Sequence, residues 1–314
     1  MRATSMNNIT IESSKIIELL IDKNLYVRDN KVISNCNMLT DLENTTNTSI
    51  NFIRKSSYDL SLLKSSIVLV PIDFKDVSNE KSLIYTINPQ LAIVYVVNSF
   101  FSDKVLNTIS EKASIDKTAK LGKNINIGDN VVIGKNCIIG DNTYIYPNCV
   151  IYPNTVIGSN VIINAGAKIG QEGFGYIKDL DGKYIQFPHI GKVIIKDNVE
   201  IGSNSCIDKG ALSDTVIGEN TKIDNLCHIS HNVKIGKNCL IVAKAEISGS
   251  TSIGDDVYIG PNVSIIDGIS IGHNAVIGMG AIVRSDVNDR STIVPFEAFE
   301  KRDYIKKLKV LNGE

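Results

Sequence analysis

Residues 121–145 read LGKNINIGDNVVIGKNCIIGDNTYI, and every sixth position in this stretch is Leu or Ile. The same period runs without a miss from Ile115 to Ile169 and returns from Ile195 to Ile207. After a longer step it continues from Ile217 to Val283. A period of six fits neither an amphipathic helix nor a simple alternating strand, and it is typical of a parallel β-helix built of hexapeptides.

Each hexapeptide is interpreted as one short strand followed by a corner, so that three hexapeptides form one coil. The repeated aliphatic side chain fills the interior, and the residue two positions before it also points inward because side chains alternate along a strand. Gly follows many of these aliphatic residues, and Asn or Asp recurs at the corners, where a positive φ is tolerated. Four cysteines take the second inward position, and we expect them to be small core residues: Cys137, Cys149, Cys227 and Cys239.

The composition bounds the possible partners. The 314 residues include 33 basic and 34 acidic side chains, for a formal net charge of −1. This balance argues against nucleic acid or an anionic membrane as a general partner. The first ten residues lack the apolar run of a signal peptide, and no apolar stretch reaches membrane-spanning length. We therefore expect a cytoplasmic protein.

Both ends of the chain lie outside the period, and the exposed strand edges of a β-helix need caps. Residues 1–110 combine a helical apolar face around Ile16 and Leu20 with strand-like segments at 66–71 and 81–87, which predicts a separate α/β domain. Residues 111–290 form the predicted β-helix. Within residues 291–314 a charged segment with an imperfect apolar stripe predicts a C-terminal helical cap.

Two interruptions of the period predict functional loops, because loops on a rigid scaffold commonly carry function. The first, GQEGFGYIKDLDGKYIQFPHIGK at 170–192, contains Glu172, Phe174 and Tyr176. The second is DKGALSDT at 208–215. A β-helix that served only as a scaffold would need neither.

The candidate for proton transfer is His231. It follows the inward Ile229 by two residues, so we expect it on a corner with its imidazole outside the prism, where histidine titrates near neutral pH. One coil later, at the same corner, stands Gly249. A glycine lets a ligand approach the backbone closely, and its N–H could hold a developing oxyanion. Asp224 could orient the imidazole.

The motifs of the chain resemble, over residues 45–285, the acyltransferases of lipid A biosynthesis that acylate the amine of a UDP-linked 3-O-acylglucosamine. The resemblance rests on INFIRKSSY at 50–58, VLVP at 68–71, INPQLA at 87–92, GFGY at 173–176, PHIGKVIIKDNVEIGSNSCIDKGALSDTVIG at 188–218 and KIDNLCHISHNVKIG at 222–236. It implies a left-handed β-helix, a homotrimer and active sites between neighbouring subunits.

The resemblance also implies roles for individual residues. It makes His231 the general base and the backbone amide of Gly249 the oxyanion donor. In the N-terminal domain it implies that two aromatic residues sandwich the nucleobase, at the positions of Phe52 and Tyr58. The remaining substrate-binding candidates are Lys55, Glu172, Phe174, Tyr176, Asn225 and His228.

The chain departs from the family pattern at several positions. Lys55 replaces the Asn that helps to read the base, and Glu172 replaces an Asp before the Gly-Phe-Gly motif. A second family histidine is missing, because the segment at 265–272 reads IIDGISIG and His273 lies in another register. These departures favour a short acyl-CoA over an acyl carrier protein as the donor.

The sequence thus predicts an N-acyltransferase that moves an acyl group from a pantetheine thioester, with acyl-CoA favoured, to the amine of a nucleotide-linked amino sugar. No metal or further cofactor is expected. One alternative is the lipid A enzyme itself, with acyl carrier protein as donor. Another is a zinc hydratase of the carbonic anhydrase type, which needs three His ligands. A third is a sugar-nucleotide-binding scaffold without activity.

Overall fold

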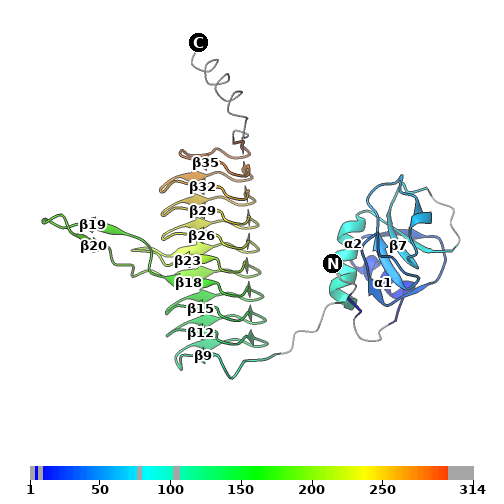
Figure 1. The fold of residues 1–314 in the computed structure, drawn as a ribbon, viewed down its shortest axis with the longest axis horizontal. Helices are drawn as coiled ribbons and strands as arrows, with labels where there is room; N and C mark the ends of the chain where they lie inside the picture. The colour runs from blue at the N-terminus through cyan, green and yellow to red at the C-terminus, as the bar shows by residue number, and fades with distance from the viewer. Residues whose placement is uncertain (1–3, 6–9, 76–79, 102–106, 296–314) are drawn as a thin grey trace, which may run out of the picture. The chain divides into compact units, whose positions relative to one another are not determined.

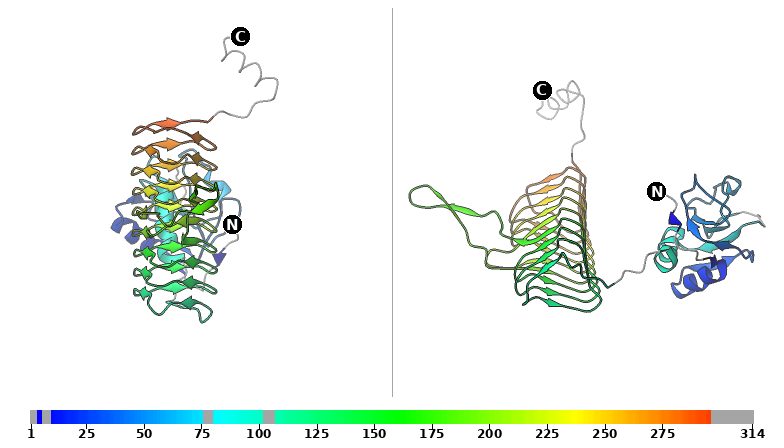
Figure 2. Two further views of the ribbon diagram at one scale, coloured as in Figure 1. Left: turned by 90° about the vertical axis from the view of Figure 1, so that its left-hand side faces the viewer. Right: turned by 60° about the horizontal axis from the view of Figure 1, so that its bottom comes forward.

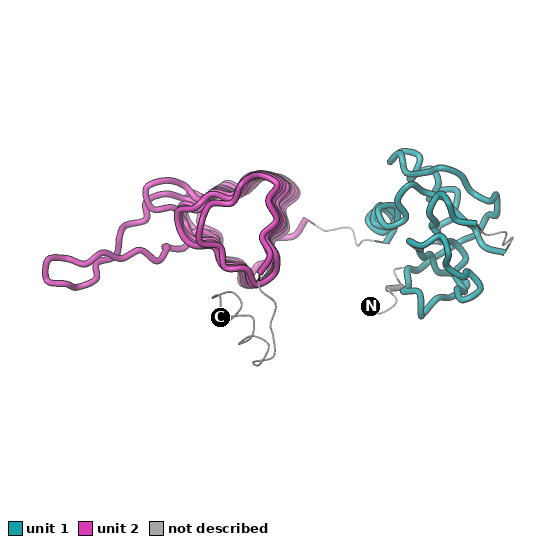
Figure 3. Tube along the Cα trace, turned by 90° about the horizontal axis from the view of Figure 1, so that it is seen from above, with its two compact units in different colours: residues 1–104 teal, residues 105–314 magenta. Residues whose placement is uncertain are grey.

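The computed structural model describes residues 4–5, 10–75, 80–101 and 107–295. The chain divides into two compact units, Met1–Lys104 and Val105–Glu314 (Figure 3). This division falls a few residues before the boundary expected at residue 110. The expected C-terminal helix lies outside the described residues. None of the described helices combines the length and the apolar character needed to cross a membrane.

The first unit is an α/β domain around one mixed sheet, in the strand order β1-β5-β6-β7-β8-β3. The helix and the two strands expected from the sequence are confirmed as α1, β7 and β8. One apolar core lies against the helices and another on the opposite side of the sheet, with Leu60 and Phe74. The elements are β1 (Thr4–Ser5), β2 (Ile11–Glu12), α1 (Ser13–Asp22), β3 (Tyr26–Asp29), β4 (Asn35–Cys36), β5 (Met38–Leu39), β6 (Ser49–Phe52), η1 (Leu60–Leu62), β7 (Ile67–Pro71), β8 (Ser82–Thr86), α2 (Pro89–Val96) and η2 (Val97–Phe101).

The second unit is a parallel β-helix with a three-sided cross-section (Figures 1 and 3). Strands pair in parallel with those one coil away, at a separation of 18 residues where no loop intervenes. One face contains β10 (Lys120–Leu121), β13 (Ile138–Ile139), β16 (Val156–Ile157), β21 (Val193–Ile195), β24 (Thr215–Ile217), β27 (Lys234–Ile235), β30 (Ser252–Ile253) and β33 (Ser270–Ile271). The second contains β11 (Asn126–Ile127), β14 (Tyr144–Ile145), β17 (Ile162–Ile163), β22 (Glu200–Ile201), β25 (Lys222–Ile223), β28 (Leu240–Ile241), β31 (Tyr258–Ile259), β34 (Val276–Ile277) and β36 (Thr292–Ile293). The third contains β9 (Ser114–Ile115), β12 (Val132–Ile133), β15 (Val150–Ile151), β18 (Lys168–Gln171), β23 (Cys206–Asp208), β26 (His228–Ile229), β29 (Glu246–Ile247), β32 (Ser264–Ile265) and β35 (Ile282–Val283).

The interior of the prism confirms both predicted inward positions. The repeated aliphatic residues from Ile127 to Val283 are buried, and so are nearly all residues two positions earlier, with Ile269 half-buried. The four cysteines expected in the core are buried and free. Burial raises the pKa of each of these thiols. The predicted fold class, a left-handed parallel β-helix of hexapeptides that follows an α/β domain in the sequence, is confirmed.

Asn and Gly have different structural roles at the corners of the prism. Asn130, Asn136 and Asn142 adopt the left-handed conformation, at φ 58°, 56° and 56°. The Asn142 amide also donates to Asn160 one coil on, at 3.2 Å. The Gly residues after the aliphatic positions serve close packing instead, since a Cβ on Gly140 would lie 2.5 Å from the carbonyl oxygen of Gly158. Small residues at these corners let successive coils stack.

The two interruptions form loops at one corner of the prism. The first contains a hairpin of β19 (Tyr176–Lys178) and β20 (Tyr184–Gln186), which projects away from the coils (Figure 2). The second joins β23 to β24 and contacts the first, because Ile190 N–H donates to the Ala211 carbonyl at 2.8 Å. Both loops therefore meet beside the coil that carries His231.

Candidate active site

His231 lies on the corner after β26, and Gly249 lies one coil later on the corner after β29, as expected. The two residues are in direct contact. A Cβ added to Gly249 would lie 2.5 Å from Cε1 and 2.7 Å from Nε2 of the His231 ring. Only glycine leaves room for the imidazole in this position, which explains why the coil after the histidine carries Gly.

The backbone around Gly249 is held by the coil ladder on both sides. Ser250 N–H donates to the His231 carbonyl, and Gly268 N–H donates to the Gly249 carbonyl, each at 2.9 Å. Within the described ranges, the Gly249 N–H itself donates to no backbone or side-chain acceptor. A fixed N–H without a partner beside an imidazole can bind an oxyanion.

Asn232 positions the imidazole. Its Oδ1 accepts a hydrogen bond from the Ala211 N–H at 2.7 Å, so its Nδ2 is the group that faces His231 Nδ1 at 3.2 Å. Its backbone adopts φ 62°, and its N–H donates to the Thr215 hydroxyl at 3.0 Å. The second loop thus holds Asn232, which in turn holds the ring. A neutral His231 that accepts from Asn232 carries its proton on Nε2.

The two histidines of the HISH segment differ in proton affinity. Burial, helped by the neighbouring His189 imidazole, lowers the pKa of His231, so this ring is neutral at pH 7 and able to accept a proton. Hydrogen bonding to Asp208 raises the pKa of His228, whose Nε2 lies 3.3 Å from an Asp208 carboxylate oxygen. Asp208 is itself buried and accepts from the Gln171 amide at 2.9 Å. His231 is therefore the histidine that is free of a proton and can accept one, whereas His228 holds a proton more firmly.

Three aromatic residues of the first loop, Phe174, Tyr176 and Tyr184, are exposed to solvent. The rings of Phe174 and Tyr176 meet edge to face, with centroids 5.0 Å apart, and together with Tyr184 they line one hollow. Phe174 is 85% exposed. An aromatic surface this open, on a two-stranded hairpin, is unusual for a face that remains in water.

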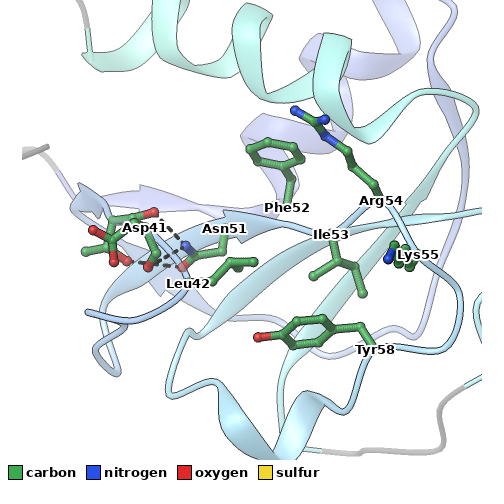
Figure 4. A pocket seen from close by; sticks show the side chains of 9 residues that line it. Asp41, Leu42, Asn51, Phe52, Ile53, Arg54, Lys55 and Tyr58 are labelled. Carbon is green, nitrogen blue, oxygen red and sulfur yellow. Dashed lines mark hydrogen bonds between the residues drawn. The ribbon is translucent and has the colours of Figure 1, made fainter. Parts of the chain in front are cut away.

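The first unit has a pocket of about 430 Å³ that contains the three residues expected to hold a nucleobase. Phe52 and Tyr58 lie on opposite sides of it, and Lys55 lies at its margin (Figure 4). Asn51 lines the same pocket, but its amide donates to the Thr40 and Asp41 carbonyls at 2.6 and 3.3 Å. The pocket therefore combines two aromatic walls, Phe52 and Tyr58, with the Lys55 ammonium group, which can only donate hydrogen bonds.

Two residues that the sequence analysis assigned to the site, Asn225 and Asp224, do not lie beside His231. Asn225 lies on the corner before β26, where its Oδ1 accepts from the Ser203 N–H at 2.6 Å. The hypothesis that Asp224 orients His231 is wrong, because its carboxylate accepts from the backbone N–H groups of Asn225 and Ala243 instead. These residues line a groove at another corner. In the part of the chain that the structure describes, no three His, Cys, Asp or Glu side chains are grouped to hold a metal ion.

Three residues of the site have no assigned role in the sequence-based predictions. Asp208 and Ala211 belong to the second loop, and His189 to the first. In the sequence, only the two interruptions of the period pointed to these residues. The interruptions showed that two loops were inserted, but not which residues the loops contact. Only the paired register of β18 and β23 brings both loops to the same corner.

Comparison with known proteins supports the hexapeptide reading. The family model described as bacterial transferase hexapeptide (six repeats) matches residues 136–171, 214–249 and 250–285. The chain is similar to the UDP-3-O-acylglucosamine N-acyltransferase of Caulobacter vibrioides (strain NA1000 / CB15N), at 54% identity over 86 residues. It is 56% identical over 86 residues to the enzyme of that name from Methylobacterium nodulans. Each match covers 27% of this chain and only 25% or 24% of the relative's length.

Solved structures extend the likeness over the β-helix. A UDP-N-acetylglucosamine acyltransferase from Bacteroides fragilis 9343 superposes with a TM-score of 0.51 and 30% identity, covering 57% of this chain and 68% of that one. The UDP-N-acetylglucosamine acyltransferase of Francisella novicida gives a TM-score of 0.53 and 27% identity, over 64% of this chain and 73% of that one. The chain therefore belongs to the hexapeptide-repeat acyltransferases, the family that includes the UDP-3-O-acylglucosamine N-acyltransferases.

Proposed function

We propose that the protein is an N-acyltransferase that moves an acyl group from a pantetheine thioester to the amine of a nucleotide-linked amino sugar. The observation that carries this proposal is the contact between the His231 imidazole and Gly249, whose N–H has no partner within the described part of the chain. A base and an oxyanion donor side by side are what acyl transfer to an amine requires.

The reaction follows from these two groups. An amine attacks the thioester carbonyl only through its free lone pair, so one N–H proton must leave as the new C–N bond forms. His231 accepts that proton on Nδ1, the nitrogen that is unprotonated while Asn232 donates to it, and the Asn232 N–H withdraws as the proton arrives. Such a proton transfer contributes about 10²- to 10⁴-fold. The Gly249 N–H stabilises the oxyanion of the tetrahedral adduct. Collapse of the adduct breaks the C–S bond and releases the pantetheine thiolate.

The pocket of the first unit supplies a site for the nucleotide. Phe52 and Tyr58 can stack on both faces of a planar base, and aromatic stacking contributes about 1–3 kcal/mol per base. Lys55 has only N–H donors, so it suits a carbonyl edge or a phosphate rather than an exocyclic amine. The roles of Glu172, Phe174, Tyr176, Asn225 and His228 in substrate binding stay predictions.

For the substrates, the named relatives favour the lipid A alternative over the acyl-CoA enzyme that the sequence departures suggested. Both curated relatives are called UDP-3-O-acylglucosamine N-acyltransferases, which names the acceptor. We accordingly propose UDP-3-O-acylglucosamine as the acceptor and, from the family resemblance, acyl carrier protein as the donor. Six free cysteines suit a reducing cytoplasm as the place of the reaction.

A substrate matrix tests the proposal. Purified protein is incubated with UDP-3-O-acylglucosamine and other nucleotide amino sugars, each with hydroxyacyl carrier protein or with acetyl- and hydroxybutyryl-CoA in competition. We expect amide formation with the UDP sugar and the carrier protein. Exclusive use of acyl-CoA would restore the expectation from the sequence, and nucleotide binding without turnover on any thioester would support a binding scaffold. Zinc at one equivalent per chain, with CO₂ hydration, would favour the hydratase.

A homotrimer with shared active sites is the assembly we propose, on the strength of the family resemblance. The exposed aromatic hairpin supports it, since Phe174 and Tyr184 leave a large apolar surface uncovered in one chain. Cyclic oligomers of this kind bury the same patch on every subunit. Light scattering should give three chains per particle even in dilute solution, and a monomer that turns over at the full rate would contradict the shared site.

A further inference from the structure

His189 belongs to the first loop and is 4% exposed. Its Nδ1 lies 2.9 Å from the Phe187 carbonyl oxygen, and this contact is a hydrogen bond only when Nδ1 carries a proton. In the neutral ring, Nε2 is then an unprotonated acceptor. Nε2 is buried without a hydrogen-bond partner in the described residues. Buried polar atoms in native proteins almost always have partners, so an unsatisfied one calls for an explanation.

The unpaired nitrogen faces a glycine wedged between two histidines. A Cβ on Gly173 would lie 2.7 Å from His189 Nε2 and 2.9 Å from His231 Cβ. The two imidazoles meet edge to face, with ring centroids 5.2 Å apart at an interplanar angle of 72°. Gly173 therefore packs against both histidines, and any larger residue there would push one ring away.

Charged residues of the two loops hold Gly173 and His189 in this arrangement. Glu172, next to Gly173, forms an ion pair with Lys209 of the second loop at 2.6 Å. The other carboxylate oxygen of Glu172 lies 3.7 Å from His189 Nδ1. Both loops are thereby tied to the His189 ring, and through Gly173 to the side chain of His231.

We propose that His189 is a positioning residue for His231. The His189 ring presses Gly173 against His231 and so keeps the His231 imidazole in place between Asn232 and Gly249. This inference rests on the proposed role of His231 as the base. His189 is itself buried, so it acts through His231 and not on the substrate.

The groups around His231 show how the His189 imidazole affects the pKa of His231. On His231, Asp208 and Asp267 favour the protonated form, whereas burial, His189 and His228 oppose it. The neighbouring imidazole of His189 thus disfavours charge on His231. Removing His189 should therefore both loosen the ring and make His231 easier to protonate.

The variants His189→Phe and His189→Gln separate these two effects. Phe keeps a flat ring but loses the hydrogen bond to Phe187, so kcat should fall roughly tenfold or more with KM unchanged. Gln keeps an N–H donor for the Phe187 carbonyl but cannot be charged, so kcat should largely recover. In both variants the acid limb of kcat/KM should move to higher pH. His273→Phe, at a solvent-exposed corner beside Asp255, is the control and should match the wild type.

A second readout does not depend on turnover. Diethyl pyrocarbonate modifies neutral imidazole, and mass spectrometry gives the extent of modification at His231 as a function of pH. A midpoint that moves upward in both His189 variants supports the inference even if no tested substrate is acylated. An unchanged midpoint together with wild-type kcat in His189→Phe overturns it, and so does a folded His189→Gln variant that recovers no turnover.

Discussion

The contact between Gly249 and His231 makes the substitution Gly249→Ala a direct test of the site. The new methyl group would lie 2.5 Å from Cε1, 2.7 Å from Nε2 and 3.1 Å from Nδ1 of the His231 ring. The backbone of Gly249 is not in the left-handed region, so alanine fits its conformation. The clash is with a side chain alone, and the coil ladder on both sides can stay as it is.

The size of the effect follows from these distances. Carbon atoms in contact prefer about 3.5–4.0 Å, so the imidazole must retreat by about 1 Å and lose its position against Asn232. A displacement of about 1 Å at a reacting group can cost about 10²-fold in rate. We therefore expect kcat to fall about a hundredfold while the Gly249 N–H remains present. Nucleotide binding in the first unit should not change.

The assay is steady-state amide formation, with thermal unfolding of each variant. Gly278→Ala is the matched control, because its methyl group would come no closer than 3.0 Å to any neighbour. For Gly249→Ala, overpacking should lower the free energy of unfolding by about 1–3 kcal/mol. In a unit of this size each kcal/mol lowers Tm by about 2–4 °C. Gly278→Ala should keep wild-type turnover.

A double-mutant cycle decides whether the clash is the cause. In a His231→Ala background the imidazole is gone, so Gly249→Ala should lose most of its destabilising effect, because residues in contact are energetically coupled. Equal destabilisation in both backgrounds would mean that the alanine disturbs the coil and not the ring. Wild-type kcat in Gly249→Ala would refute the placement of the base against this glycine.

Three further predictions concern the base and the nucleotide. His231→Ala should lower kcat by about a hundredfold or more with nucleotide binding intact, and His228→Ala should matter less, as parallel kinetics and calorimetry would show. Phe52→Ala should weaken nucleotide-sugar binding roughly tenfold in a titration, whereas unchanged binding would reduce the first unit to a cap. Because the pKa of His231 is lowered, the acid limb of kcat/KM should lie below about pH 6.5, and Asn232→Asp, which places a carboxylate at Nδ1, should move the limb upward.

The chemical character of the site was partly readable from the chain. The corner position of His231 and the coil-spaced Gly249 follow from counting residues, because a period of six with three sides places every eighteenth residue on the same corner. Both residues lie where this arithmetic puts them. The aromatic pair Phe52 and Tyr58 came from motif likeness instead, and the shared pocket is a property of the fold around β6.

The residues that complete the site could not be read in this way. The Ala211 N–H reaches Asn232 across 21 residues, and His189 approaches His231 through Gly173. Irregular loops have no period from which such contacts can be counted. The same limit explains the error over Asp224, whose position seven residues before His231 places it on a different corner, bound to Ala243.

The sequence by itself determined the prism, its buried rows and the corner of the base, because each coil repeats one local pattern and pairs only with its neighbours. Only the tertiary structure decided the state of the base. The proton affinity of His231 depends on burial and on the imidazole of His189, and its orientation depends on an amide held by a loop from the preceding coil. These are effects of distance and desolvation between segments far apart in the chain, and a one-dimensional pattern does not encode them.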